Sequence, residues 1–248
     1  MNSDPSHVKV GTCGFGRVKR PDYAKLFSAV EIQHTFYHPP EIATLEKWRH
    51  ELPDSLECTI KAWQMITHEG SSPTYSRLGR PLTESEAEEV GFFKPTAAVA
   101  EALEVTLASA RALNARTILF QCPAKFHPLP ENILNMKSFF SSFDRTGLNC
   151  VWEPRGKAWE TELIKDICEE LDLWDCVNPF QRQTTTPDRC YFRLHGQPRW
   201  RYTYEDEELY ELAEMLPKDR LSYVFFNNIT MKDDALRLIG VMDQQVNL

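Results

Sequence analysis

The feature that most constrains the fold is a repeated alternation between short apolar runs and longer helical stretches. Eight runs of β-branched and aromatic residues, each bounded by turn residues, are typical of buried strands. They cover residues 8–13, 29–34, 57–63, 116–122, 148–153, 173–178, 189–195 and 222–227. Because strands that alternate with helices pair in parallel, eight repeats predict an α/β fold, a single (β/α)8 TIM-type barrel. A doubly wound open sheet is the alternative.

Helices are predicted between most of these strands. They cover residues 22–28, 41–52, 96–113, 130–143, 158–171, 204–216 and 230–242. Thr96 is the expected N-cap of the long Ala-rich helix, and Thr230 that of the last helix, with Asp233 at its third position. One barrel needs about 250 residues. The 248 residues of the chain therefore predict one domain over residues 1–248.

Two segments break the alternation. Residues 64–95 are too long for an ordinary strand-to-helix connection. They contain an acidic run from Glu84 to Glu89. A long loop after a barrel strand either covers the active face as a lid or is a surface insertion, and both interpretations stay open. Residues 179–188 are too few for a full sixth helix, so we expect a shortened one, a turn or a 3₁₀ piece.

Charge and cysteine content limit the function classes. The formal net charge of −8 disfavours a broad nucleic-acid-binding face but not a local basic pocket. The seven cysteines form no CxxC pair, which indicates buried thiols in a reducing compartment. No cofactor is predicted, and a divalent metal is not excluded. No apolar run approaches the roughly 20 residues of a membrane span, and the N-terminus carries no signal pattern. We therefore expect a soluble, cytoplasmic protein. The sequence does not determine its oligomeric state.

Strand alternation points a set of polar side chains into the barrel. Val30 and Ile32 suit the helix-facing side, so Glu31 and Gln33 face inward. The same rule predicts an inner ring near the carboxyl ends of the strands: Glu31, Gln33, Lys61, Gln121, Glu153, Arg193 and Asn227. Active sites of this fold lie at that end. The ring is either a ligand site, which we favour, or a set of structural ion pairs, because buried charges need partners.

Six segments resemble signatures of the YecE-like family, also called domain of unknown function 72. GTCGF at 11–15 resembles its GTSGW/F start, with Cys13 at the usual serine. VEIQHTFY at 30–37 resembles its VEIN-x-TFY motif, with Gln33 at the usual asparagine. The others are IKA at 60–62 with ITH at 66–68, WEPR at 152–155 with Trp159, YFRLHG at 191–196 with Tyr202 and Tyr204, and YVFFNN at 223–228. The resemblance spans nearly the whole chain and implies a TIM-type barrel, but no established reaction.

The residue types favour an enzyme that acts on a small anionic substrate, phosphorylated or carboxylated. Lys61, Arg155 and Arg193 would hold the anion. Glu153, oriented by Arg155, would be the acid/base, with Glu31 as the second carboxylate. The candidate proton shuttles are His34, His68 and His195. The remaining candidate substrate-binding residues are Gln33, Gln121, Tyr37, Tyr204 and Asn227. A hydrolase, a lyase and an isomerase all fit this set.

Two alternative functions use the same residues. A metal-dependent, endonuclease-like barrel could draw its ligands from Glu31, His34, Glu153 and His195. Neighbouring Lys61 and Arg193 would repel a cation, and the acidic chain makes nucleic acid an unlikely partner. The other alternative is a non-catalytic protein that binds a small ligand in the same pocket.

Overall fold

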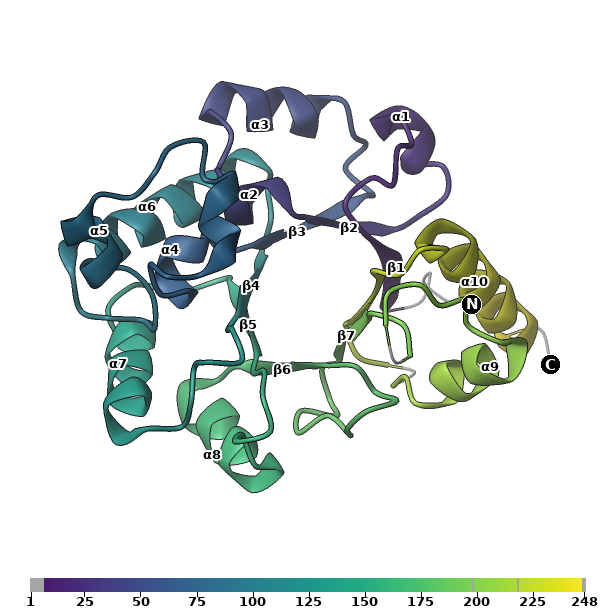
Figure 1. Ribbon diagram of the computed structural model, residues 1–248. Helices are drawn as coiled ribbons and strands as arrows, with labels where there is room; N and C mark the ends of the chain where they lie inside the picture. Colours follow the sequence, from purple (N-terminus) through teal and green to yellow (C-terminus); the bar gives the residue numbers. More distant parts are fainter. Residues whose placement is uncertain (1–6, 198, 218, 247–248) are drawn as a thin grey trace. The chain divides into compact units, whose positions relative to one another are not determined.

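Eight strands close into a barrel in chain order, as the sequence predicts (Figure 1). The computed structural model describes residues 7–197, 199–217 and 219–246. The strands are β1 (Val8–Cys13), β2 (Ala29–Ile32), β3 (Glu57–Lys61), β4 (Thr117–Gln121), β5 (Asn149–Glu153), β6 (Trp174–Val177), β7 (Tyr191–Leu194) and β8 (Ser222–Phe226). The closed order β1 to β8 confirms the barrel and excludes the open-sheet alternative.

Helical segments follow most strands. They are α1 (Arg20–Tyr23), α2 (His34–Tyr37), α3 (Ile42–His50), α4 (Gln64–Thr67), the 3₁₀ helix η1 (Pro73–Arg77), α5 (Glu84–Glu89), α6 (Ala97–Ala112), α7 (Pro130–Ser141), α8 (Thr161–Leu171), α9 (Asp206–Glu214) and α10 (Met231–Val246). In the described part of the chain, no helix is long and apolar enough to cross a membrane.

The chain divides into two compact units. Unit 1 comprises Met1–Glu31, Glu51–Glu57 and Trp174–Leu248, and unit 2 comprises Ile32–His50 and Cys58–Leu173. Each unit has its own strands, helices and buried side chains, and each is described separately below.

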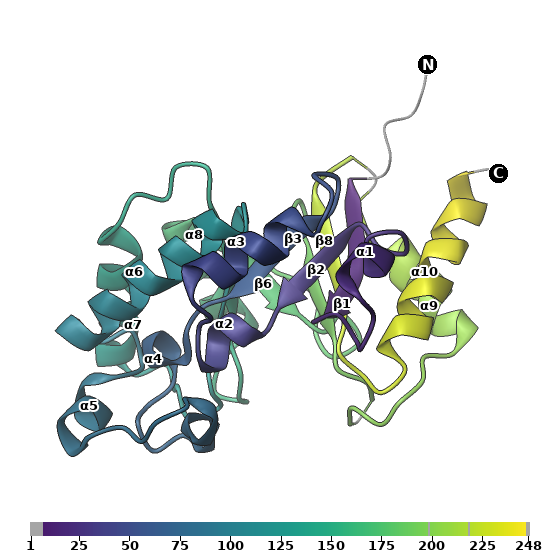
Figure 2. The ribbon, with the colours of Figure 1, turned by 90° about the horizontal axis from the view of Figure 1, so that it is seen from above.

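Unit 1 is built around β1. This strand pairs in parallel with β8 and β2, and β7 pairs with β8 and β6. A Cβ on Gly11 would lie 1.9 Å from the Ala29 carbonyl oxygen, so only glycine permits this approach of β1 to β2. Helix α10 packs on β1 and β8, with α9 beside it (Figure 2). The register places Cys13 opposite Glu31, and Arg193 opposite Phe225.

Unit 2 contains the parallel strands β3, β4 and β5. Helix α6 packs against α3, α4 and α5. An aromatic cluster fills the space beside α7: the Phe93 ring centroid lies 5.1 Å from that of Phe139 and 5.6 Å from that of Phe140. Phe120 on β4 lies 5.1 Å from Phe140. These rings bury a large apolar area, which packs β4 against α7.

The predicted second strand is two residues too long. It was expected over 29–34, but β2 ends at Ile32 and α2 begins at His34. Gln33 has φ −90° and ψ −21°, in the helical region. The Thr35 hydroxyl lies 2.7 Å from the Lys61 carbonyl oxygen and 3.2 Å from that of Ile32. Such side-chain bonds to backbone oxygens compete with strand pairing and end it early. The prediction that Gln33 continues the alternation of a strand is therefore wrong.

Other element ends move by a few residues. The third, seventh and eighth strands end at Lys61, Leu194 and Phe226, so His195 and Asn227 follow their strands rather than ending them. Among the helices, α1 is displaced to Arg20–Tyr23 and α10 runs to Val246. The Thr96 cap is confirmed, since its hydroxyl accepts from the Val99 N–H at 3.3 Å.

The two irregular segments are both ordered. Residues 64–95 contain α4, η1 and α5. The end of this segment returns to α4, where the Gly91 N–H donates to Met65 O at 2.8 Å and the Phe93 N–H donates to Ile66 O at 2.9 Å. Residues 179–188 form turns and bends without a helix, which agrees with the expected turn and not with a shortened helix. The fully buried Asp175 of β6 accepts from Arg182 at 2.6 and 2.8 Å and from the Thr185 N–H at 2.8 Å. These hydrogen bonds hold the segment against β6 in the absence of a helix.

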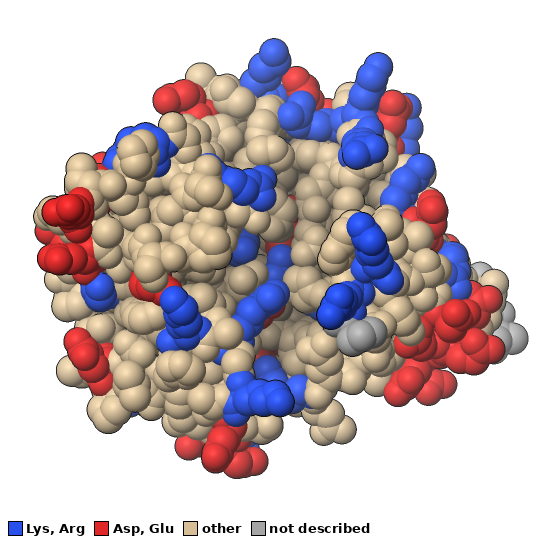
Figure 3. Space-filling view, in the orientation of Figure 1, with Lys and Arg blue, Asp and Glu red and all other residues tan. Residues whose placement is uncertain are grey.

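All seven cysteines are buried and free, as predicted. The surface view shows acidic side chains gathered over α5 and α9 (Figure 3). The first turns of these helices carry Glu84 and Glu86, and Asp206, Glu207 and Glu208. Acidic residues at helix N-termini stabilise the helix dipole. The same charges repel a polyanion from these parts of the surface.

Candidate active site

Lys61 is the buried cation of unit 2. It is the last residue of β3 and is 5% exposed. Its Nζ lies 3.4 Å from the centroid of the Phe36 ring, which is buried on α2. A cation over an aromatic face gains about 2 kcal/mol when both are desolvated. Phe36 therefore compensates part of the hydration that the ammonium loses, and it fixes the position of the charge.

Glu153 is the carboxylate of unit 2. It ends β5 and is 7% exposed. Its Oε1 accepts hydrogen bonds from Arg155 Nε at 3.0 Å and Nη2 at 2.6 Å. The Arg155 side chain is 39% exposed. Gln121 ends β4 opposite Glu153 in the register, so both side chains leave the same edge of the sheet. The predicted orientation of Glu153 by Arg155 is present in the structure.

His68 completes this group. It is buried, and its Nδ1 lies 2.8 Å from the Thr67 hydroxyl. Burial is the main cause that lowers the pKa of His68 from 6.5 to about 3, and the charges of Lys61 and Arg155 contribute to this shift against the opposing effect of Glu153. His68 is therefore a neutral imidazole that interacts electrostatically with Lys61, Arg155 and Glu153. We call Lys61, His68, Glu153 and Arg155 the cationic cluster.

The Glu31 cluster lies in unit 1 and consists of Cys13, Glu31, Tyr191 and Arg193. Glu31 is 0% and Arg193 1% exposed. The Glu31 carboxylate accepts from Tyr191 Oη at 2.7 Å, Arg193 Nη2 at 2.9 Å and Cys13 Sγ at 3.2 Å. Burial raises the pKa of the Cys13 thiol, and the Glu31 charge raises it further, so the thiol stays protonated and donates. The predicted inward-facing Glu31 and Arg193 thus form a buried ion pair.

Two further predicted residues meet beyond β7 and β8. Asn227 Nδ2 lies 3.1 Å from His195 Nδ1, and the Asn227 backbone N–H donates to Leu194 O at 2.8 Å. Tyr204 does not join this pair. It is fully buried, its hydroxyl accepts from the Gly196 N–H at 3.0 Å, and burial raises its pKa. Tyr204 therefore shapes the loop that follows β7.

Gln33 and Tyr37 line a small cavity of about 190 Å³ in unit 2, with His34, His38 and Arg77. The Arg77 guanidinium carbon lies 3.5 Å from the Tyr37 ring centroid. Neither residue belongs to the cationic cluster as defined above. Phe36 is the important neighbour that alternation alone did not single out. The contact of Phe36 with Lys61 depends on the short helix α2, which the alternating pattern did not predict.

Comparison with known sequences decides the family. The profile of the family described as protein of unknown function DUF72 matches residues 16–248. The chain belongs to the DUF72 family. A curated relative, the UPF0759 protein YunF of Bacillus subtilis, is 24% identical over 247 residues, which cover 86% of this chain and 81% of YunF.

Solved DUF72 structures share the fold. A DUF72 family protein from Enterococcus faecalis is 20% identical, with a TM-score of 0.71 and 98% coverage of both chains. Another from Thermotoga maritima is 20% identical, with a TM-score of 0.68 over 97% of this chain and 99% of its own. More distant barrels are a xylose isomerase domain containing protein from Salmonella typhimurium (TM-score 0.62, 12% identity) and a family 2 AP endonuclease from Brucella melitensis (0.56, 12%).

The motif residues of this DUF72 protein have structural places. The first motif supplies Cys13 and the second Glu31, which meet in the Glu31 cluster. The later motifs supply Lys61 and Glu153 of the cationic cluster. Among the described residues, no three His, Cys, Asp or Glu side chains converge in a group that could hold a metal ion.

Proposed function

We propose that this DUF72 protein is an enzyme that acts on a small anionic substrate, phosphorylated or carboxylated, through the cationic cluster. The observation that carries the proposal is the charge balance of that cluster. Lys61 and Arg155 are cations, Glu153 is an anion, and His68 is neutral because of its lowered pKa. The cluster therefore has a net positive charge, with Lys61 and Glu153 at the carboxyl ends of β3 and β5. Barrel enzymes place their active sites at this end.

The side chains divide into binding and proton-transfer roles. Lys61, held over Phe36, supplies a fixed positive charge for a phosphate or carboxylate oxygen. Arg155 holds Glu153 through its Nε and Nη2, and its partly exposed side chain would contact the substrate from the solvent side. Glu153 is then the acid/base, since a carboxylate fixed in one orientation transfers protons efficiently. Gln121, its neighbour in register, would bind a substrate hydroxyl.

The predicted residues of unit 1 lie outside the cationic cluster. Glu31 accepts hydrogen bonds from three donors, one of them Arg193, so in this proposal it holds Arg193 in place. The His195–Asn227 pair is a separate hydrogen-bonded group within unit 1, beyond β7 and β8. The likeness to a xylose isomerase domain containing protein is one of fold, so hydrolase, lyase and isomerase chemistry all stay compatible with the cluster.

The test is a thermal-shift screen of the purified protein against sugar phosphates, sugar acids, nucleotides, short DNA and divalent metals. A substrate-like anion at about 100 times its Kd should raise the Tm by roughly 5–10 °C, since such binding adds about 2.7 kcal/mol. Lys61→Met keeps most of the side-chain volume and should abolish the shift. Lys137→Met removes an exposed lysine that pairs with Glu170, and it should leave the shift intact.

Three outcomes would overturn the proposal. An anion that stabilises Lys61→Met as well as the unaltered protein does not use the cationic cluster. Stabilisation by DNA together with a metal, and by no small anion, would favour the endonuclease-like alternative. A small anion that binds through Lys61 and is recovered unchanged under every assay condition would make the protein a binding protein rather than an enzyme.

A further inference from the structure

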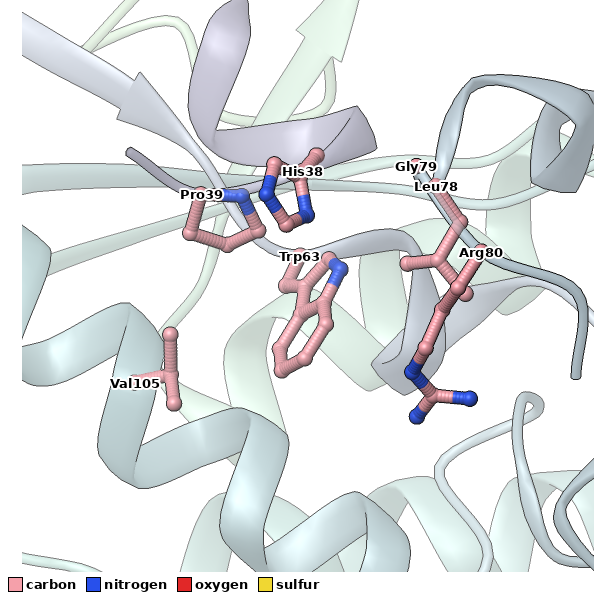
Figure 4. Close-up of a pocket in the computed structure, with 7 residues that line it drawn as sticks. All are labelled: His38, Pro39, Trp63, Leu78, Gly79, Arg80 and Val105. Atoms are coloured by element: carbon pink, nitrogen blue, oxygen red, sulfur yellow. The ribbon is translucent and has the colours of Figure 1, made fainter. Parts of the chain in front are cut away.

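A cavity of about 340 Å³ lies in unit 2, on residues that have no part in the cationic cluster (Figure 4). Trp63 occupies its middle, with His38 and Pro39 on one side, Leu78 and Arg80 on another, and Val105 of α6 beyond the ring. Gly79 completes the lining. The volume is within the range of roughly 300–1,000 Å³ that is typical of small-molecule sites.

Trp63 brings an unsatisfied donor to this cavity. Its indole Nε1 is buried and has no hydrogen-bond partner among the residues that the structure describes. An indole N–H can only donate, and leaving it unsatisfied costs about 1–3 kcal/mol. The main chain that carries the ring is held in place, because the Trp63 backbone N–H donates to Thr106 Oγ1 of α6 at 3.3 Å. A ligand that supplies an acceptor oxygen to Nε1 would recover this free energy.

The other lining groups narrow the chemistry of the ligand. No carboxylate is among the seven residues that line the cavity. Pro39, Leu78 and Val105 are apolar walls, and His38 adds an imidazole. The Arg80 guanidinium is bound by Glu86 at 2.5 and 2.9 Å, so Arg80 contributes its aliphatic stem to the wall. An occupant must therefore combine an apolar body with an acceptor, and nothing in the lining repels a negative charge.

We propose that this cavity binds a small carboxylate carried on an apolar ring. One carboxylate oxygen accepts from Trp63 Nε1, the other meets His38, and the ring packs against Leu78 and Val105. His38 and Arg80 are exposed side chains, so rotation of either one opens the way to Nε1. The site does not depend on the proposed function, since it shares no residue with the cationic cluster.

The experiment is an NMR titration of ¹⁵N-indole-labelled protein with benzoate as the probe. The chain has six tryptophans, and the Trp63 signal is assigned from the Trp63→Phe variant. Benzoate should shift the Trp63 indole signal downfield and saturably, with a Kd of about 1 mM for a ligand of this size. The other five signals should stay in place. Toluene, which has the ring but no acceptor, should produce no such shift.

Two variants test the location of the site. Val105→Phe fills the cavity from a half-buried position on α6, and His38→Ala removes the second polar contact from an exposed one. Each should weaken benzoate binding at least about tenfold, while Glu153→Gln should leave it unchanged. No saturable Trp63 shift, an equal shift with toluene, or undiminished binding to both variants would overturn the proposal. Because Glu153→Gln is the control, failure here is distinct from failure of the proposed enzyme.

Discussion

At the scale of single residues, Glu153 is the side chain on which the proposed chemistry depends most. Replacing it with glutamine keeps its size but removes its ability to take a proton. We expect Glu153→Gln to lower kcat by about 10²–10⁴-fold once a substrate is known, with Tm nearly unchanged. Steady-state kinetics measure this, and Glu162→Gln, an exposed change in the first turn of α8, is the matched control. Full turnover by Glu153→Gln would remove Glu153 from the mechanism.

The buried Glu31–Arg193 pair makes a prediction about stability. Glu31→Leu leaves the Arg193 charge buried without its carboxylate, so it should lower the free energy of unfolding by about 3–5 kcal/mol. The double variant Glu31→Leu/Arg193→Leu should lose less than the sum of the two single changes, because no lone charge stays behind. Urea unfolding of all four proteins measures the difference. Strict additivity would show that the two charges are not coupled.

His68 makes the stability of the protein depend on pH. Its pKa is about 3 in the folded protein and about 6.5 when unfolded, so the unfolded chain binds the proton more tightly. The contribution of neutral His68 is complete above pH 6.5 and is lost as the pH falls towards 3. The slope should reach about 1.4 kcal/mol per pH unit in this window. His68→Gln should unfold with a shallower acid slope, whereas the exposed His50→Gln should keep the original one.

At the scale of the element, the end of α6 makes a further prediction. Asn114 follows this helix with φ +50°, and the Ala115 N–H donates back to Ala110 O at 2.8 Å. Asparagine and glycine adopt this left-handed conformation more easily than other residues. Asn114→Ala should therefore cost about 1 kcal/mol, and Asn114→Gly should not destabilise. Asn135→Ala, within α7, is the control that should not destabilise either. Thermal unfolding of the three variants measures these changes in stability. An equal loss of stability in Asn114→Ala and Asn114→Gly would contradict the prediction.

Element ends are where the sequence pattern was least informative. Strand periodicity correctly placed Glu153 at the end of its strand and Lys61 near the end of its strand, because flanking Ile60 and Trp152 show which face is buried. It failed at Gln33, since Thr35 ends β2 through hydrogen bonds to two carbonyl oxygens, one of them in another strand. Such a long-range bond leaves no periodic signal. The contact of Lys61 with Phe36 depends on the same short helix, so it was hidden for the same reason.

At the scale of the whole molecule, eight alternating runs sufficed to predict a closed barrel, because topology follows from the order of elements rather than their exact ends. Pairing between charges was harder to predict. The inner ring of polar residues was expected either as a ligand site or as ion pairs. Within unit 1, Glu31 and Arg193 form a fully buried ion pair, whereas in unit 2 Arg155 keeps part of its side chain in solvent. Only coordinates distinguish these two arrangements, since both need the same residue types.

The alkylation rates of the seven buried thiols would report how often each part of the protein opens. Cys13, Cys176 and Cys190 belong to unit 1, and Cys58, Cys122, Cys150 and Cys168 to unit 2. An alkylating reagent can reach a buried sulfur only while its surroundings are open, so each modification rate counts local opening events. Mass spectrometry of peptides from a partly alkylated sample would read all seven rates at once. Equal rates would mean that the chain opens in one step, and two groups of rates would mean that the units open separately.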